Sequence, residues 1–453
     1  MHDLSTTLAA VATAPGRGGI GCLRISGPGA YAIAGGLVST ARPLDLPGDG
    51  RPLFCTFHDE RGTGLDHGYV VAFPPERAYT GEPTVELWTH GSPPVLEALA
   101  RAAVAGGAQP AGPGEFTYRA LRRGRLDLTR AEAVRDLIAA RTTYQARVAF
   151  RQVEGASARR VAPLRAALID LVAAGEAAIE FADEAETHLA TGALASGLAE
   201  ASASARALVE EAQRGRIVRS GARVALSGVT SVGKSSLFNR LLGRDRAIVS
   251  PVAGTTRDTL EETFDLDGIP VTLIDTAGVR PAQDAVEAEG VRRAKEATGG
   301  ADLVIRVLDA SRGLRKDERS ALSGPAPEGF APVIVVANKV DLAKPPAADE
   351  PWPGAIPISA LTGAGLPALL RAIREALCGT GPFEDPVLTN DRHLAALERT
   401  VDSLDRAQSA LPLGDELVLE DLRAALHALG ELTGEFLNDD LYDRIFSTFC
   451  IGK

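Results

Sequence analysis

The stretch "GVTSVGKSS", residues 228–236, restricts the possible folds of this chain more than any other feature. It fits the pattern G-x-x-x-x-G-K-[ST]. It also follows the strand-like run "RVALSG" and opens a helix, and in this context the pattern forms a phosphate-binding loop. The backbone N–H groups of such a loop and the N-terminus of the helix hold phosphate groups. We therefore expect an α/β domain that binds a nucleotide through this loop.

The residues expected to contact the phosphates lie close to predicted strands. Lys234 would reach the β- and γ-phosphates, and Ser235 would bind Mg²⁺. In "DTAG", residues 275–278, Asp275 can lie just beyond the direct ligands of Mg²⁺, and Gly278 can meet the γ-phosphate. The stretch "AGTTRD" between these motifs supplies Thr256 as a second Mg²⁺ ligand.

Two later motifs predict recognition of guanine. In "NKVD", residues 338–341, Asp341 can accept hydrogen bonds from guanine N1–H and N2–H₂, and adenine lacks that amino group. Lys339 would lie along the base, and a backbone N–H of "SAL", residues 359–361, would bind the guanine carbonyl. Four motifs in this order predict GTP binding. The predicted GTP contacts are Ser231, Val232, Gly233, Lys234, Ser235, Ser236, Ser250, Pro251, Val252, Ala253, Gly254, Thr255, Thr256, Asp275, Thr276, Ala277, Gly278, Asn338, Lys339, Val340, Asp341, Ser359, Ala360 and Leu361.

Hydrolysis needs a residue that orients the attacking water, and Ras-like proteins carry a glutamine directly after DTAG. Val279 occupies that position here. The stretch that follows offers three acids, Asp284, Glu287 and Glu289, and each could equally be a solvated acid in the first turn of a helix. Spacing alone leaves the choice open.

Three parts are predicted along the chain. Residues 1–118 mix β-rich runs such as "GIGCLRIS" and "TVELWTH" with turns and helical stretches, which indicates an α+β domain. Residues 216–380 alternate strand-like runs with helices, which predicts a parallel, doubly wound sheet. Residues 119–215 and 381–453 show helical periodicity, so we expect the α/β domain to be inserted into a helical domain.

Composition limits how the protein can bind nucleic acid and in which cellular compartment it is expected. The net charge of −11 limits any nucleic-acid site to a local basic patch. Residues 119–165 hold twelve Arg and four acidic residues, so they could contact nucleic-acid phosphates or simply form solvated, ion-paired helix faces. The four cysteines have no metal-ligand spacing, and no apolar stretch is long enough to span a bilayer, which together favour the cytoplasm.

Lysine is scarce. Only six of the 48 basic residues are Lys, so each one is a candidate for a position where Arg is a poor substitute. Three of the six are Lys234, Lys339 and the last residue, Lys453.

With these motifs the whole chain resembles the MnmE (TrmE) family of tRNA modification GTPases, within the TrmE-Era-EngA-like superfamily. The resemblance is carried from end to end by "ATAPGRGGIGCLRISG", "YTGEPTVELWTHG", "GPGEFTYRALRRGRLDLTRAEAV", "AIVSPVAGTTRD", "DTAGVR" and "LTGEFLNDDLYDRIFSTFCIGK". It implies an N-terminal domain that binds a reduced folate, 5-formyl- or methylene-tetrahydrofolate, and forms a homodimer. It also implies a flavin-containing partner, MnmG, with which a carboxymethylaminomethyl or aminomethyl group is added at C5 of the wobble uridine of tRNA.

The alternative is a ribosome-assembly or RNA-binding GTPase, but a helical, acid-bearing segment follows the G domain instead of a basic appendage. A dynamin-type membrane GTPase would need a lipid-facing tip or polybasic loop, and the sequence shows neither.

The resemblance also implies residue roles. Glu287 would orient the water indirectly, and a potassium ion would take the role of an arginine finger. The implied ligands of this potassium ion are the Ser231 side chain and the carbonyls of Ser250, Val252 and Thr255. The implied folate contacts are Arg24, Glu86, Arg125 and Lys453.

Two positions depart from the family pattern. Thr230 and Ser231 replace the usual Pro and Asn of the phosphate-binding loop, and Ser231 has the shorter reach toward potassium, which predicts weaker potassium dependence. Arg125 stands where the family commonly has Lys.

The last four residues, "CIGK", could suggest prenylation, but Gly452 is not aliphatic and Lys is a poor last residue for that signal. A nucleophilic Cys450 is an alternative. We prefer the prediction that Phe446 and Phe449 anchor the tail, and that Lys453 closes over the folate site.

Overall fold

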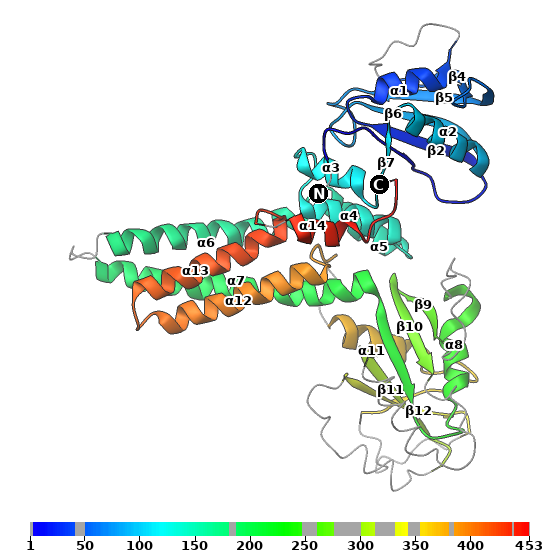
Figure 1. Ribbon diagram of the computed structural model, residues 1–453. Helices are drawn as coiled ribbons and strands as arrows, with labels where there is room; N and C mark the ends of the chain where they lie inside the picture. Colours follow the sequence, from blue (N-terminus) through cyan, green and yellow to red (C-terminus); the bar gives the residue numbers. More distant parts are fainter. Residues whose placement is uncertain are drawn as a thin grey trace, which may run out of the picture. The chain divides into compact units, whose positions relative to one another are not determined.

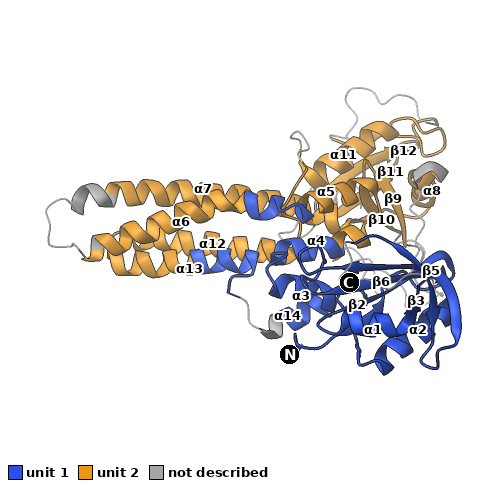
Figure 2. Cartoon of the chain, turned by 90° about the horizontal axis from the view of Figure 1, so that it is seen from above, with its two compact units in different colours: residues 1–135, 152–159, 426–453 blue, residues 136–151, 160–425 orange. Residues whose placement is uncertain are grey.

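The computed structural model describes residues 3–40, 50–180, 187–246, 261–275, 300–312, 331–342, 354–379, 385–436 and 439–452. The chain divides into two compact units, each made of separate stretches of sequence (Figure 2). Unit 1 comprises residues 1–135, 152–159 and 426–453, and unit 2 comprises residues 136–151 and 160–425. The unit boundaries after residues 135, 151, 159 and 425 fall inside helices.

Unit 1 contains a seven-stranded sheet with the order β3-β4-β5-β6-β2-β1-β7. Its strands are β1 (Leu8–Val11), β2 (Gly18–Ser26), β3 (Val38–Ser39), β4 (Leu53–His58), β5 (Gly64–Phe73), β6 (Thr84–Gly91) and β7 (Gln109–Pro110). Helices α1 (Ala30–Leu37) and α2 (Pro93–Ala105) contribute to its core. Successive strand residues face opposite sides, so Leu23 and Leu87 are buried in this core while Arg24 and Glu86 face away from it.

The helices of unit 1 form a second core. They are α3 (Glu115–Arg122), α4 (Leu128–Ala139), which continues into unit 2, and α14 (Asp439–Phe446). Tyr118 of α3, Leu128 of α4 and Phe446 of α14 are buried together. The C-terminal segment is therefore part of the N-terminal unit's core.

Unit 2 contains a six-stranded sheet with the order β13-β12-β11-β8-β10-β9 (Figure 1). Its strands are β8 (Ala222–Ser227), β9 (Glu261–Leu266), β10 (Ile269–Asp275), β11 (Leu303–Asp309), β12 (Val333–Asn338) and β13 (Ile356–Pro357), with helices α8 (Lys234–Arg246) and α11 (Leu366–Cys378). All neighbouring pairs are parallel except β9 with β10. The predicted α/β fold is confirmed. The sequence patterns had not identified β9, which adds as an antiparallel edge strand.

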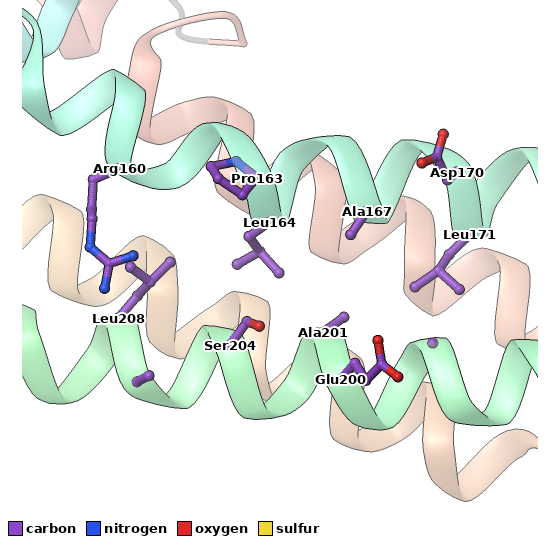
Figure 3. Close-up of a pocket in the computed structure, with 12 residues that line it drawn as sticks. Arg160, Pro163, Leu164, Ala167, Asp170, Leu171, Glu200, Ala201, Ser204 and Leu208 are labelled. Atoms are coloured by element: carbon purple, nitrogen blue, oxygen red, sulfur yellow. The ribbon is translucent and has the colours of Figure 1, made fainter.

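The other described elements of unit 2 are helices. Four long helices, α6 (Ala156–Glu180), α7 (Thr187–Ser220), α12 (Asp391–Ala410) and α13 (Asp415–Thr433), run side by side (Figure 1). A pocket of about 510 Å³ lies between α6 and α7, lined by apolar residues such as Leu164 and Leu171 with Asp170 and Glu200 near it (Figure 3). Among the described residues no helix is both long and apolar enough to cross a membrane.

Helix α5 (Thr143–Val153) is attached to the six-stranded sheet at its N-terminal end. Thr142 Oγ1 donates a hydrogen bond to the carbonyl of Gly268, in the β9–β10 turn, at 2.6 Å. Gln145 Nε2 donates to the carbonyls of Val218 and Arg219, at the end of α7, at 2.8 and 2.9 Å. These bonds hold the β9–β10 hairpin and the entry to β8 against the same helix.

Candidate functional sites

The predicted phosphate-binding loop connects β8 to α8. Gly228 and Gly233 have φ values of 143° and 98°, which favour glycine. A Cβ on Gly233 would lie 2.3 Å from Asn338 Nδ2, so a side chain there would collide with the NKVD segment. The loop therefore has the close turns that its glycine pattern predicts.

Lys234 begins α8 and is largely buried, with 7% of its surface exposed. Its Nζ donates hydrogen bonds to the carbonyls of Gly228 at 2.7 Å and Val229 at 3.0 Å. The ammonium group thus lies over its own loop. Ser235 and Ser236 are exposed in the first turn of the same helix, where a helix N-terminus favours anions.

Asn338 joins three of the predicted motifs. Its Nδ2 donates to the carbonyl of Val232 at 2.9 Å, and its Oδ1 accepts from the N–H of Ala360 at 2.9 Å. Asn338 is only 2% exposed and Ser359 is fully buried. These bonds fix the phosphate-binding loop, NKVD and SAL at one edge of the sheet, as expected for the carboxyl ends of parallel strands.

Lys339 and Asp341 have different surroundings. Lys339 has a left-handed φ of 69°, and its Nζ donates to the carbonyl of Ser231 at 2.7 Å and to Asp309 Oδ2 at 2.7 Å. Asp341 and Leu361 are exposed, while Val340 donates its N–H to the carbonyl of Ile358 at 3.2 Å. Asp309 was not among the residues predicted from the sequence, because it belongs to no motif.

Several predicted residues lie outside the described part of the chain. β10 ends at Asp275, whose side chain is also not described. The Mg²⁺, K⁺ and catalytic assignments therefore stay predictions. The predicted residues outside the described ranges are Ser250, Pro251, Val252, Ala253, Gly254, Thr255, Thr256, Thr276, Ala277, Gly278, Asp284, Glu287, Glu289 and Lys453.

Arg24 and Glu86, two predicted folate contacts, face each other across β2 and β6 of unit 1. Arg24 Nε and Nη2 donate to Glu86 Oε1 at 3.0 and 2.8 Å, and Trp88 Nε1 donates to Glu86 Oε2 at 2.9 Å. The Arg24 guanidinium also lies over the Phe116 ring, 5.6 Å from its centre. Both charged side chains are 15% exposed, so they form a partly buried ion pair on the face of the sheet opposite the apolar core.

The end of the chain reaches this ion pair. Ile451 forms a β-bridge with Pro113, and Gly114 donates its N–H to the carbonyl of Cys450 at 3.2 Å. Arg24 Nη1 donates to the carbonyl of Gly452 at 3.3 Å. Gly452 has a φ of 93°, and a Cβ on it would lie 2.4 Å from the Val11 carbonyl oxygen, so only glycine fits this turn. The predicted ordered tail is thus present through Gly452.

Arg125, the remaining described residue of the predicted folate set, binds a nearby loop. Its Nη2 donates to the carbonyls of Glu76 at 2.7 Å and Ala78 at 3.2 Å. Within the described residues its contacts are to this loop rather than to the Arg24–Glu86 pair. Arg125 is exposed, so its guanidinium can also meet a ligand from solvent.

The cysteines differ in accessibility. Burial raises the pKa of the Cys55 and Cys378 thiols to about 11, whereas Cys450 is exposed. The described residues contain no group of three or more His, Cys, Asp or Glu side chains that could hold a metal ion.

At least six of the twelve arginines between residues 119 and 165 form ion pairs with acidic side chains. Arg119 is fully buried and donates to Glu82 Oε2 at 3.1 Å. Arg123 also donates to Glu82. Arg147 and Arg151 both bind Asp385 at 3.1 Å. These residues fit the ion-paired interpretation of the basic stretch, and the buried Arg119–Glu82 pair was not visible in the sequence because its partners are far apart in the chain.

The chain is similar to known proteins over nearly its whole length. Residues 7–125 match the family described as the GTP-binding protein TrmE N-terminus, and residues 128–450 match the MnmE helical domain. The chain is 43% identical to the tRNA modification GTPase MnmE of Alkalilimnicola ehrlichii and 40% identical to that of Nitrosomonas europaea, over 99% of both chains in each case. Among solved structures, Aquifex aeolicus Era bound to GDP and aluminium fluoride is 31% identical over 40% of this chain and 66% of that chain, with a TM-score of 0.28.

Both domain families match, and the relatives align over nearly their whole length. The phosphate-binding loop, NKVD and SAL segments meet at one sheet edge, and the tail meets the N-terminal sheet. This chain therefore belongs to the MnmE (TrmE) family of tRNA modification GTPases.

Proposed function

We propose that this tRNA-modifying GTPase works with the flavoprotein MnmG to add a carboxymethylaminomethyl or aminomethyl group at C5 of the wobble uridine. The one-carbon unit would come from 5-formyl- or methylene-tetrahydrofolate. The observation that carries this proposal is the hydrogen bond from Arg24 to the carbonyl of Gly452, because it brings the chain end next to the Arg24–Glu86 pair. Lys453 directly follows Gly452 in sequence.

The Arg24–Glu86 site suits a folate in its chemistry. A pterin presents an amide and amino edge that a carboxylate such as Glu86 can bind, and the anionic glutamate tail suits Arg24, Arg125 or Lys453. Glu86 accepts three hydrogen bonds from Arg24 and Trp88, and a carboxylate offers about four acceptor positions. Bidentate binding of a pterin would use one acceptor position on each oxygen, and Oε1 already accepts two hydrogen bonds from Arg24, so one of those two bonds would have to be given up.

For GTP hydrolysis we assign Lys234 to the β- and γ-phosphates, Ser235 and Thr256 to Mg²⁺, and Glu287 to the water. The exposed position of Ser235 in the first turn of α8 supports the Mg²⁺ assignment.

We further propose that Ser231, with backbone carbonyls at 250, 252 and 255, binds K⁺. Ser231 is exposed and has a φ of 68°, so its hydroxyl can face a ligand. The GTPase rate should be higher in potassium than in sodium, and equal rates would contradict the assignment.

We propose that the chain forms a homodimer through the outer face of the unit 1 sheet. Ile20, Phe54, Tyr69 and Trp88 are large apolar side chains on or beside this face, and Ile20 and Phe54 are 69% and 63% exposed. They line a surface pocket of about 590 Å³. Exposed apolar patches of this kind favour association.

We also propose a cytoplasmic location, because the four free cysteines fit a reducing compartment.

Nucleoside analysis of tRNA tests the proposed modification. A strain that lacks this protein should carry unmodified wobble uridine, and the wild-type chain should restore the modification. Replacing Arg24 with alanine should weaken binding of a reduced folate and lower the modification while GTP hydrolysis continues. Normal tRNA nucleosides together with defective ribosomes in the deletion strain would instead favour a ribosome-assembly function.

A further inference from the structure

Asp309 is the last residue of β11, and it is in register with Asn338, the last residue of β12. It therefore lies at the carboxyl edge of the sheet, where the predicted nucleotide motifs gather. Its side chain is only 8% exposed. No motif considered above assigns it a role.

The Asp309 carboxylate binds the lysine of NKVD. Lys339 Nζ lies 2.7 Å from Asp309 Oδ2 and 2.7 Å from the carbonyl oxygen of Ser231. The ammonium group thus bridges β11 and the phosphate-binding loop. The left-handed backbone of Lys339, with φ of 69°, directs the chain through this tight turn.

Other contacts keep Asp309 in place and charged. The N–H and hydroxyl of Ser311 donate to Asp309 Oδ1 at 3.0 and 2.5 Å. Burial raises the pKa of Asp309, but hydrogen bonds from Lys339 and Ser311 outweigh burial and hold that pKa below its ordinary value. The side chain is therefore a carboxylate at neutral pH, with a fixed orientation toward Lys339.

We propose that Asp309 is a positioning residue for guanine-nucleotide binding, which holds the Lys339 ammonium against the phosphate-binding loop so that its side chain lies along the base. A lysine side chain has several rotatable bonds, and ordering it costs conformational entropy. With Asp309 in place, part of that cost is met before the nucleotide binds. The inference rests on the proposed assignment of Lys339 to the guanine base.

This role predicts a specific pattern of affinities. Lys339 along the base plane does not read the exocyclic amino group of guanine, whereas Asp341 would. Loss of Asp309 should therefore weaken the binding of guanosine diphosphate (GDP) and of inosine diphosphate (IDP) by the same factor. Because the ion pair is partly exposed, we expect the loss to be about three- to tenfold.

The test compares Asp309→Asn with a matched control, Asp302→Asn. Asp302 lies directly before β11, at the other end of the same strand, and accepts from the Arg223 N–H at 2.8 Å. Binding of GDP and IDP and the GTPase rate at saturating GTP are measured for both full-length variants. We expect Asp309→Asn to bind GDP and IDP more weakly by the same factor, with an unchanged GTPase rate at saturating GTP. Asp302→Asn should bind both nucleotides as tightly as the wild type. Asp309→Glu, which keeps the charge, should recover part of the affinity.

A double-mutant cycle with Lys339→Ala separates the two levels of the proposal. If Asp309 acts through Lys339, the double variant should bind no more weakly than Lys339→Ala alone. Wild-type affinity of Asp309→Asn, additive losses in the double variant, or an equal loss in Asp302→Asn would overturn the role of Asp309. If Lys339→Ala itself has no effect, the assignment of Lys339 to the base fails, and the role of Asp309 fails with it.

Discussion

At the scale of single residues, two of the six lysines do similar work. Lys234 and Lys339 each place Nζ 2.7 Å from a backbone carbonyl of the phosphate-binding loop. An ammonium is a compact charge that fits between carbonyls, whereas a guanidinium is broad and planar. This gives a physical reason for lysine rather than arginine at these two positions.

Replacing Lys234 with arginine should therefore lower GTP hydrolysis by about tenfold or more, although the charge is kept. The guanidinium is too wide for a site that is only 7% exposed and is bounded by the carbonyls of Gly228 and Val229. Steady-state GTPase kinetics measure the effect. The matched control is Lys344→Arg, in the Pro-rich stretch "AKPPAADEPWPG", which should hydrolyse GTP at the wild-type rate. An active Lys234→Arg enzyme would contradict this view of the loop.

Thiol reactivity should also differ between residues. Burial raises the pKa of Cys55 and Cys378 to about 11, so at neutral pH almost all of each thiol is protonated and unreactive. Cys22 is also buried, and Cys450 is exposed. A maleimide reagent should modify the native protein at Cys450 within minutes and the other three slowly, as read by intact mass. Cys450→Ser should abolish the fast phase, and a fast phase that persists in this variant would show the buried sites to be accessible.

At the scale of elements, the β9–β10 hairpin contains one strand with a typical strand sequence and one without it. β10 reads "IPVTLID", an apolar run typical of a strand, but β9 reads "EETFDL", whose charged residues are not typical of one. Its turn, Asp267-Gly268, has φ values of 52° and 93°, as two-residue hairpin turns require. Local patterns therefore predicted the parallel strands and the phosphate-binding loop. They could not predict contacts such as Thr142 with Gly268 or Arg24 with Gly452, because these join residues far apart in the sequence.

A substitution in this turn tests how firmly the hairpin is held. Gly268→Ala should reduce the free energy of unfolding in urea by about 3 kcal/mol. Of this, about 1 kcal/mol comes from the left-handed backbone and the rest from a Cβ that would lie 2.4 Å from the Tyr144 Cβ. Gly363→Ala is the matched control, since Gly363 has a similar φ of 88° but nothing within 4 Å of its Cβ position, so it should lose only about 1 kcal/mol. Equal losses in the two variants would mean that Tyr144 yields easily.

At the scale of the whole molecule, the two candidate sites belong to different units. The candidate GTP site consists of residues of unit 2, and the Arg24–Glu86 pair with the chain end consists of residues of unit 1. The sequence predicted both sites by different routes. Motif spacing predicted the GTP site from the residues themselves, whereas the folate set followed from family resemblance alone. Because the two sites share no residue, we expect that each can be removed by substitution without loss of the other.

Deletion of the last four residues, Cys450 to Lys453, tests whether the chain end is needed for tRNA modification but not for GTP hydrolysis. The deletion removes the β-bridge of Ile451 with Pro113 and the carbonyl of Gly452 that binds Arg24, but it leaves the buried Phe446 and Phe449. The measurement is the modified wobble uridine content of tRNA in a deletion strain supplied with the truncated chain, alongside the GTPase rate of the purified truncated protein. We expect the modification to be lost while GTP hydrolysis stays within about twofold of the wild-type rate. Normal modification, or loss of GTP hydrolysis together with the modification, would contradict this expectation.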